Sequence, residues 1–199
     1  MSDIPSTEHF SASDAPELVV APSATFVATT GSGRPGSDAF YRKHALIADV
    51  ARALADNGLA PTTPPVIEML FWYPDHLPSA DIADFYSLNP IPSLLYRVTA
   101  RIDEHASADD IARARSAAAS EADRPDELLE RYVLKEHAVV QVMHHGPFAN
   151  EFATLARLGE FAQRAGLRRA GPHREIHLDS FTRTTPQDGL RTILRDPVA

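Results

Sequence analysis

Two glutamates lie in the middle of segments whose composition is typical of β-strands. Glu68 lies in VIEMLFWYPD, residues 66–75, the most apolar run of the chain, and Glu175 lies in HREIHLD, residues 173–179. An ionised carboxylate is costly to bury without a partner, so each glutamate needs either a nearby cation or a position in a cleft. Two carboxylates that face one cleft repel each other, which can leave one of them protonated. Such a pair can supply a general acid and a general base.

The histidines beside Glu175 offer a second chemistry. His173, Glu175 and His177 stand two residues apart, so on a strand their side chains share one face. They could converge there on Zn²⁺ or a similar ion. The alternative is the polar wall of a cleft. We favour the polar wall, and we expect neither a metal nor a cofactor.

A glycine-rich stretch, GSGRPG at residues 31–36, has the spacing of a dinucleotide-binding fingerprint. Pro35 removes a backbone donor beside the position of the phosphate. The order of the surrounding elements also gives antiparallel neighbours rather than a doubly wound sheet. We therefore interpret the stretch as a flexible turn.

The elements that position these residues occur twice. The first half of the chain predicts a strand, a helix and two strands, at residues 24–30, 38–57, 66–73 and 94–102. Ser37 is a suitable N-cap for this helix, and Gly58 a suitable stop. The second half repeats the order, at residues 138–144, 148–164, 173–179 and 190–198, with Gly166 ending the helix.

This repetition is the signature of an internal duplication. It predicts an α+β fold of two βαββ modules, about 24–102 and 138–198, related by a pseudo-twofold axis. Antiparallel sheets and a ligand cleft between the modules complete the expected architecture. A linker helix at about 107–120, capped by Ser107, is expected to join the modules.

Two further segments have a distinct composition. Residues 1–20 are rich in Ser, Asp, Pro and Ala and are predicted to be a disordered tail, which leaves 21–199 as the folded domain. The Pro-punctuated connection at residues 74–92 includes a possible short helix at 82–86. A connection of this length is either a lid or slack, and we expect it to cover one mouth of the cleft.

The duplication places the two glutamates at matching positions, each in the strand that follows the helix of its module. Alternation along the first of these strands puts Glu68, Leu70 and Trp72 on one face. If the apolar faces of both strands meet the helices, both glutamates point into one concavity between the modules. Trp72 would then form an aromatic wall beside a carboxylate, which suits a flat ligand with a cationic or electron-poor end.

Charge and composition limit the possible partners. The 199 residues carry a formal net charge of −8 and include no cysteine. The acidic balance argues against nucleic acid, the absence of cysteine favours a reducing cytoplasm, and no run is long enough to span a bilayer. We expect a cytoplasmic monomer or homodimer whose partner is a hydrophobic or cationic small molecule.

Three blocks of the sequence resemble the GyrI-like small-molecule-binding family of the SOUL/GyrI superfamily. TTGSGRPGSDAF resembles the family's glycine-rich turn, and VIEMLFW resembles its Leu-Glu-Gly-Leu-Trp-Trp strand. The C-terminal half of the family is matched by VVQVMHHGPFANEFATL, REIHLD and TPQDGLRTILRDPV. The sequence departs from the family pattern at four positions, with Met69 for Gly, Phe71 for Trp, Arg174 for His and His177 for Tyr.

The resemblance implies two βαββ modules with a ligand cleft between them. Stand-alone members of this type are associated with the hydrolysis of cyclopropanoid, DNA-alkylating natural products by cleft glutamates and aromatic residues. Carried over by position, these are Glu68 and Glu175 as catalytic residues and Trp72 as an aromatic wall. Other expected ligand contacts are Leu70, Tyr96, Phe148 and His177. Because histidine titrates near neutrality and tyrosine does not, the resemblance carries no catalytic role of the family's tyrosine over to His177.

The leading functional prediction is hydrolytic detoxification of electrophilic, cyclopropanoid-type toxins. The alternative is a non-catalytic binder that sequesters several drugs or senses an effector. Turnover separates the two, because a binder releases its ligand chemically unchanged.

Overall fold

The structure is a computed structural model that describes residues 4–61, 64–118 and 127–199. Within these ranges the chain forms strands β1 to β8, helices α1 to α3 and two short 3₁₀ turns. In chain order the elements are β1 (Glu17–Ala21), β2 (Ala24–Ser32), α1 (Asp38–Ala55), β3 (Ile67–Trp72), η1 (Ile91–Ser93), β4 (Leu95–Ile102), α2 (Ala108–Ala118), β5 (Glu130–Leu134), β6 (His137–His145), η2 (Phe148–Asn150), α3 (Glu151–Arg164), β7 (His173–His177) and β8 (Arg191–Pro197).

The strands form one antiparallel sheet in the order β1-β6-β8-β7-β3-β4-β2-β5. Read outward from the central β3–β7 pair, each half repeats the same order: β3-β4-β2 on one side and β7-β8-β6 on the other. Each half also contains one long helix: in the chain, α1 lies between β2 and β3, and α3 lies between β6 and β7. The predicted fold class, α+β with duplicated βαββ modules, is therefore confirmed, and the two modules share one continuous sheet.

The strand that precedes each module pairs with the other module. β1 directly precedes β2 in the chain, yet it pairs with β6, where Val19 lies opposite Val139. β5 directly precedes β6, yet it pairs with β2, where Tyr132 lies opposite Phe26. Each half of the sheet is thus completed by a strand from the other half of the chain.

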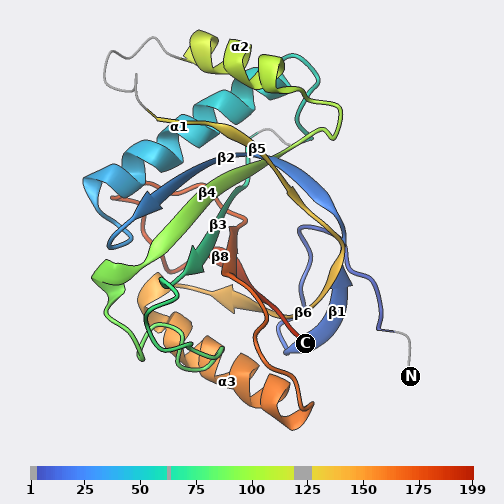
Figure 1. Cartoon of the computed structure of the whole chain (residues 1–199), viewed down its shortest axis with the longest axis vertical. Helices are drawn as coiled ribbons and strands as arrows, with labels where there is room; N and C mark the ends of the chain where they lie inside the picture. The colour runs from blue at the N-terminus through green and yellow to red at the C-terminus, as the bar shows by residue number, and fades with distance from the viewer. Residues whose placement is uncertain (1–3, 62–63, 119–126) are drawn as a thin grey trace.

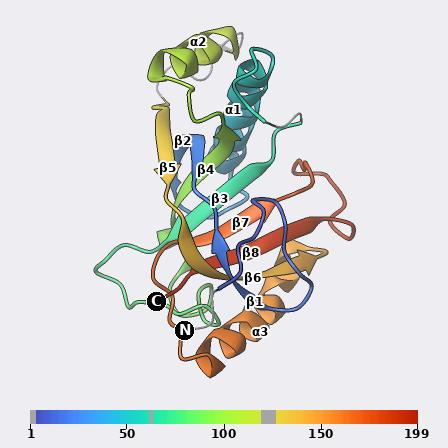
Figure 2. The ribbon, with the colours of Figure 1, turned by 90° about the vertical axis from the view of Figure 1, so that its right-hand side faces the viewer.

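Helices α1 and α3 cover the same face of the sheet at its two ends (Figures 1 and 2). α1 packs its apolar residues Leu46, Ile47 and Val50 against strands β2, β3 and β4. α3 packs Leu155 and Leu158 against β6 and β8 in a second apolar cluster. The space between the two helices lies over the central strands β3 and β7.

Most of the predicted elements are present with small differences in length. Ser37 Oγ accepts a hydrogen bond from the backbone N–H of Phe40 at 3.2 Å, and α1 ends at Ala55, two residues earlier than predicted. Gly58 and Gly166 follow α1 and α3 with positive φ angles of 72° and 73°, as helix-ending glycines do. Ser107 caps α2 through its Oγ, and residues 119–120 of the predicted linker helix lie outside the described residues.

The prediction of a disordered tail is wrong for residues 4–20. Val20 and the segment before it exchange backbone hydrogen bonds, from Thr7 N to Val20 O and from Val20 N to Pro5 O. Val19 and His9 are buried. Polar groups of the segment form hydrogen bonds with residues far along the chain. Gln141 Nε2, for example, donates to Ser11 O at 3.0 Å. Residues 1–3 lie outside the described residues.

The connection from β3 to β4 is an ordered wall rather than a loose loop. Residues 82–86 form successive turns, with Leu88 N donating to Asp84 O at 3.0 Å, so the predicted short helix is absent there. Ile82 and Phe85 are fully buried, and Asn89 Nδ2 donates to Pro78 O at 2.8 Å. Ile82 belongs to the same apolar cluster as Leu155 and Leu158 of α3, so the connection packs against that helix.

Gly159 of α3 lies against Ala83 of this connection. A Cβ atom added at Gly159 would lie 2.6 Å from the Cβ atom and 2.8 Å from the backbone nitrogen of Ala83. Gly159→Ala is therefore expected to lower the free energy of unfolding by about 1–2 kcal/mol, because overpacking outweighs the gain in helix propensity. Urea denaturation measures this change. Gly189→Ala is the control, since nothing lies within 4 Å of its Cβ position; equal stability of the two variants would contradict the prediction.

In the described parts of the chain, none of the helices combines the length and the apolar character needed to cross a membrane.

Candidate functional site

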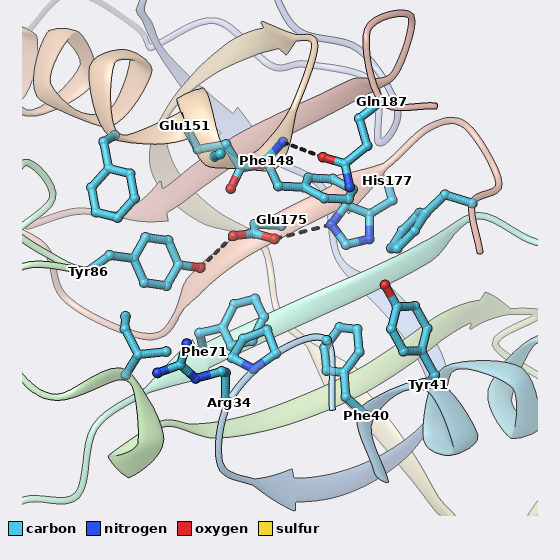
Figure 3. A pocket seen from close by; sticks show the side chains of 16 residues that line it. Arg34, Phe40, Tyr41, Phe71, Tyr86, Phe148, Glu151, Glu175, His177 and Gln187 are labelled. Atoms are coloured by element: carbon cyan, nitrogen blue, oxygen red, sulfur yellow. Dashed lines mark hydrogen bonds and ion pairs between the residues drawn. The ribbon is translucent and has the colours of Figure 1, made fainter. Parts of the chain in front are cut away.

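A cavity of about 510 Å³ lies between α1 and α3, over the central strands (Figure 3). Its floor is formed by Phe71 of β3 and by Glu175 and His177 of β7. The remaining lining comes from five other parts of the chain: the glycine-rich turn, the start of α1, the β3–β4 connection, the residues at the start of α3, and the β7–β8 loop. These residues are Arg34, Pro35, Gly36, Phe40, Tyr41, Tyr86, Ile91, Phe148, Ala149, Glu151, Phe152, Phe181 and Gln187.

Glu175 is held on both oxygens. Tyr86 donates its hydroxyl hydrogen to Oε1 at 2.5 Å, and the His177 ring donates from Nε2 to Oε2 at 3.1 Å. Figure 3 shows the carboxylate between these two side chains at the floor of the cavity. Only 7% of the Glu175 side chain is exposed, so the carboxylate is placed in a nearly dry environment with a fixed orientation.

A second carboxyl group, that of Glu151, points toward the same place from the first turn of α3 (Figure 3). Burial and the neighbouring Glu175 raise the pKa of Glu151 well above its usual range. Burial would also raise the pKa of Glu175, but the adjacent rings of His173 and His177 outweigh it and lower the pKa below its usual value. The two pKa shifts thus run in opposite directions, which favours a charged carboxylate at Glu175 and a neutral carboxylic acid at Glu151.

A buried histidine lies behind Glu175. His173 Nδ1 donates to Asp196 Oδ2 of β8 at 2.9 Å, and its Nε2 lies 3.6 Å from Glu175 Oε1, an ion-pair distance rather than a hydrogen bond. Burial would lower the pKa of His173, but Asp196 and Glu175 outweigh it and raise the pKa to about 9. The ring is therefore an imidazolium at neutral pH.

Aromatic rings form a large part of the cavity wall. The ring centroids of Phe148 and Phe181 are 4.9 Å apart, and that of His177 lies within 5.3 Å of both. Tyr86 and Phe152 meet edge to face at 6.0 Å on the other side. Rings that present faces and edges in this way suit a flat apolar ligand.

Two polar groups at the rim come from loops. Gln187 of the β7–β8 loop accepts a hydrogen bond from the backbone N–H of Phe148 through Oε1 at 3.2 Å. Arg34 lies in the turn at residues 33–37 that joins β2 to α1. Two glycines of this turn, Gly33 and Gly36, have positive φ angles of 100° and 84°, a conformation that glycine adopts at little cost. The GSGRPG stretch thus begins as the end of β2 and continues as a turn whose residues Arg34, Pro35 and Gly36 line the cavity.

The expectation that Glu68 and Glu175 face one cleft is wrong. β3 and β7 are antiparallel neighbours in which Glu68 lies opposite Ile176 and Met69 lies opposite Glu175. Directly opposed residues share a face of the sheet, so the two glutamates lie on opposite faces. Only Glu175 faces the helices and the cavity.

Glu68 is instead part of a buried ion-pair cluster on the other face. Arg174 Nε donates to Glu68 Oε2 at 2.8 Å, and the His9 ring donates from Nε2 to Glu68 Oε1 at 2.6 Å. Burial would raise the pKa of Glu68, but Arg174 and His9 outweigh it and lower the pKa to about 2. Glu68 is therefore an ionised carboxylate with two fixed partners.

The other predicted ligand contacts divide between the two faces. Phe148 and His177 line the cavity together with Glu175. Tyr96 is fully buried on the cavity side of the sheet, behind Phe40 and Phe71, at ring distances of 5.6 and 6.3 Å. Leu70 lies opposite Arg174 on the far face. Trp72 lies on that face as well, where the guanidinium of Arg97 is 5.7 Å from its ring centroid.

Two residues of the site, Glu151 and Tyr86, are absent from the predictions made from sequence. Glu151 had a usable signal, because it stands at helical spacing between Phe148 and Leu155 on the buried stripe of α3. Tyr86 had none, since its position depends on how the β3–β4 connection packs. Within the described ranges, no group of three or more His, Asp or Glu side chains is arranged so that it could hold a metal ion.

Comparisons with known proteins agree with this architecture. A protein from Listeria innocua described as an uncharacterized conserved protein is 24% identical, with a TM-score of 0.72 over 96% of this chain and 95% of its own. A hydrolase from Listeria innocua is 22% identical, with a TM-score of 0.70 over 96% and 94%. The C-terminal domain of EcmrR is 14% identical, with a TM-score of 0.58 over 92% and 96%.

At such low identity these structures establish the fold alone. A comparison with curated proteins finds no match. The profile of the GyrI-like small molecule binding domain, however, matches residues 79–195, more than half of the sequence. The chain therefore belongs to the GyrI-like family of small-molecule-binding domains.

Proposed function

We propose that this protein binds a flat, hydrophobic small molecule in the cavity between α1 and α3 and hydrolyses electrophilic, cyclopropanoid-type toxins there. The observation that carries the proposal is that the carboxyl groups of Glu175 and Glu151 line one buried, aromatic cavity, where the pKa of Glu175 is lowered and that of Glu151 is raised. Two carboxyl groups whose surroundings push their pKa values apart are suited to act as base and acid at the same pH.

The reaction can be written with these two groups alone. Glu151 donates its proton to the carbonyl oxygen of a cyclopropane-fused dienone, and Glu175 accepts a proton from a water molecule. The water oxygen attacks the ring carbon, the strained C–C bond breaks, and its electron pair restores an aromatic phenol. One water is added in total, and a proton passing from Glu175 to Glu151 restores both groups.

The surroundings of the pair favour such a step. A low-dielectric site strengthens the interaction of a fixed carboxylate with developing positive charge, and the aromatic walls position the ligand over the floor. The resemblance to stand-alone members associated with cyclopropanoid hydrolysis supports the same substrate class. The proposal gives Glu175 and Glu151 the catalytic roles, in place of Glu68, and gives ligand contacts to Phe148, His177 and Tyr86.

A second candidate function, binding without turnover, is favoured by one observation. Both oxygens of Glu175 already accept hydrogen bonds, from Tyr86 and His177, as expected for a carboxylate that serves as a fixed counter-charge. Such a site would retain a cationic aromatic drug and release it unchanged, as in drug sequestration or effector sensing. In either form we propose a cytoplasmic monomer or homodimer without a nucleic-acid or membrane partner.

Incubation of the purified protein with a cyclopropanoid probe, followed by mass spectrometry, separates the two functions. Hydrolysis is expected to convert several equivalents of probe per protein into a product that contains one added water. Probe that is recovered intact after tight binding would reject the hydrolase and support the binder. Boiled protein is the control for spontaneous ring opening.

A further inference from the structure

A chain of three buried groups runs from the floor of the cavity into the core. It begins at Glu175, continues through His173 two residues earlier on β7, and ends at Asp196 on β8. The His173 and Asp196 side chains are 0% exposed. His173 and Asp196 are not among the residues that line the cavity, so neither is in a position to touch a ligand there.

We propose that Asp196 and His173 form a buried positioning pair that keeps Glu175 ionised and fixed in orientation beneath the ligand. The role of Glu175 as a base rests on the proposed function, whereas its ionisation by this pair is a property of the protein alone. The geometry gives each group one task. Asp196 supplies the negative charge that holds the ring as an imidazolium, and the imidazolium supplies the positive charge that Glu175 needs.

Burial makes this pair necessary. A carboxylate that is almost completely removed from water becomes protonated unless a cation lies nearby. The groups that face Glu175 are Tyr86 from the β3–β4 connection, Glu151 from α3, and His173 and His177 from its own strand. Tyr86 is neutral and Glu151 disfavours a second negative charge, so the histidines must supply the compensation.

His173 is the better protected of the two histidines. Phe85 packs on its ring at a centroid distance of 4.9 Å, and Tyr86 meets it edge to face at 5.7 Å. Its partner Asp196 lies on the strand that pairs with β7. His177 instead lines the cavity, where an arriving ligand contacts it. The compensation from His173 is therefore independent of whether the cavity is filled.

The test compares His173→Gln and Asp196→Asn with the wild type. In Asp196→Asn the side-chain amide oxygen can still accept the His173 hydrogen bond, so this variant removes the charge and retains the fold. In the pH profile of kcat, the acidic limb is expected to shift to higher pH. The shift is roughly 1–3 pH units in His173→Gln, the scale of losing one opposite charge, and smaller in Asp196→Asn. Above the shifted limb, kcat is expected to recover to within a few-fold of the wild type.

A second readout does not depend on activity. The ¹³C chemical shift of the Glu175 carboxyl carbon, assigned by comparison with Glu175→Gln, reports its ionisation directly. It is expected to titrate below the usual glutamate range in the wild type and higher in both variants. Asp179→Asn is the control, because it removes the same charge from a surface ion pair with Arg191; its profile and titration are expected to match the wild type.

Each outcome decides the inference separately from the proposed function. If the wild type hydrolyses no cyclopropanoid, the proposed function fails and the carboxyl titration alone decides the inference. A Glu175 titration that is the same in the wild type and in both variants would overturn it. A uniform loss of kcat at every pH, in proportion to the loss of folded protein, would also overturn it, since that is the behaviour of a merely structural pair.

Discussion

Glu175→Gln is expected to reduce kcat for hydrolysis of a cyclopropanoid probe by about 10²- to 10⁴-fold, the range typical of losing a general acid or base. Glutamine has nearly the shape of glutamate, and its amide oxygen can still accept the Tyr86 hydrogen bond. It cannot take a proton from water at neutral pH. Because the lost interaction belongs to the transition state, KM is expected to change little.

Glu151→Gln tests the other half of the pair. It removes the proton donor and retains a neutral polar group, so a loss of similar size is expected, with ligand affinity retained. Glu160→Gln is the matched control, since Glu160 lies on the same helix with a side chain that is 68% exposed. Activity is compared per folded protein, measured by near-UV circular dichroism. If both cavity variants turn the probe over at the wild-type rate, the assignment of the two carboxyl groups is rejected.

How far the sequence predicts this site is best seen at the two glutamates. Alternation of side chains along each strand was predicted correctly: Glu68 shares a face with Leu70 and Trp72, and Glu175 shares one with His173 and His177. What alternation cannot supply is the register between two strands that are distant in sequence. A shift of one residue moves every side chain to the other face, and the prediction assumed that both apolar faces meet the helices.

That assumption holds for β3 and fails for β7. Met69 and Phe71 of β3 pack under α1, whereas the helix-facing side of β7 carries Glu175 and the two histidines. This polar face of β7 can be buried beneath the cavity because its side chains form hydrogen bonds with Tyr86, with Asp196 and with each other. Pairings of this kind depend on the tertiary structure, so composition and periodicity do not reveal them.

The N-terminal segment and β5 were missed for a related reason. β1 finds its partner about 120 residues away in β6, and β5 finds its partner about 106 residues away in β2, judged from Val19–Val139 and Tyr132–Phe26. Local composition carries little information on such pairings. The duplication itself was visible, because it depends on the order of locally encoded strands and helices, and that order gave the fold class.

The position of Glu68 in the most apolar strand has a structural explanation. The Glu68 and Arg174 side chains are 0% and 3% exposed, and His9 brings the N-terminal segment to the same carboxylate. Removing one partner of such a pair leaves a buried charge without compensation, which is more costly than removing both. The cluster therefore links Glu68 to His9, 59 positions away along the chain, and to Arg174, 106 positions away.

Glu68→Gln is accordingly expected to lower the free energy of unfolding by about 3–5 kcal/mol, the usual cost of breaking a buried ion pair. Glu130→Gln is the matched control. Glu130 pairs with Arg97 across the sheet at 2.8 Å, but its side chain is 48% exposed, and exposed pairs contribute only about 0–1 kcal/mol. The double variant Glu68→Leu with Arg174→Met is expected to lose less than Glu68→Gln alone, because no charge is left unpaired.

The pH dependence of stability follows from the same cluster. The pKa of Glu68 falls from 4.5 to about 2 on folding, so the unfolded chain binds the proton more tightly than the folded protein does. The stabilisation by ionised Glu68 is thus complete above pH 4.5 and is lost as the pH falls toward 2, and it amounts to roughly 3 kcal/mol at about 1.4 kcal/mol per pKa unit. Urea denaturation at several pH values is expected to show a difference between the wild type and Glu68→Gln that shrinks across this window. A difference that stays constant from pH 6 to pH 2 would show that the ionisation of Glu68 does not stabilise the fold.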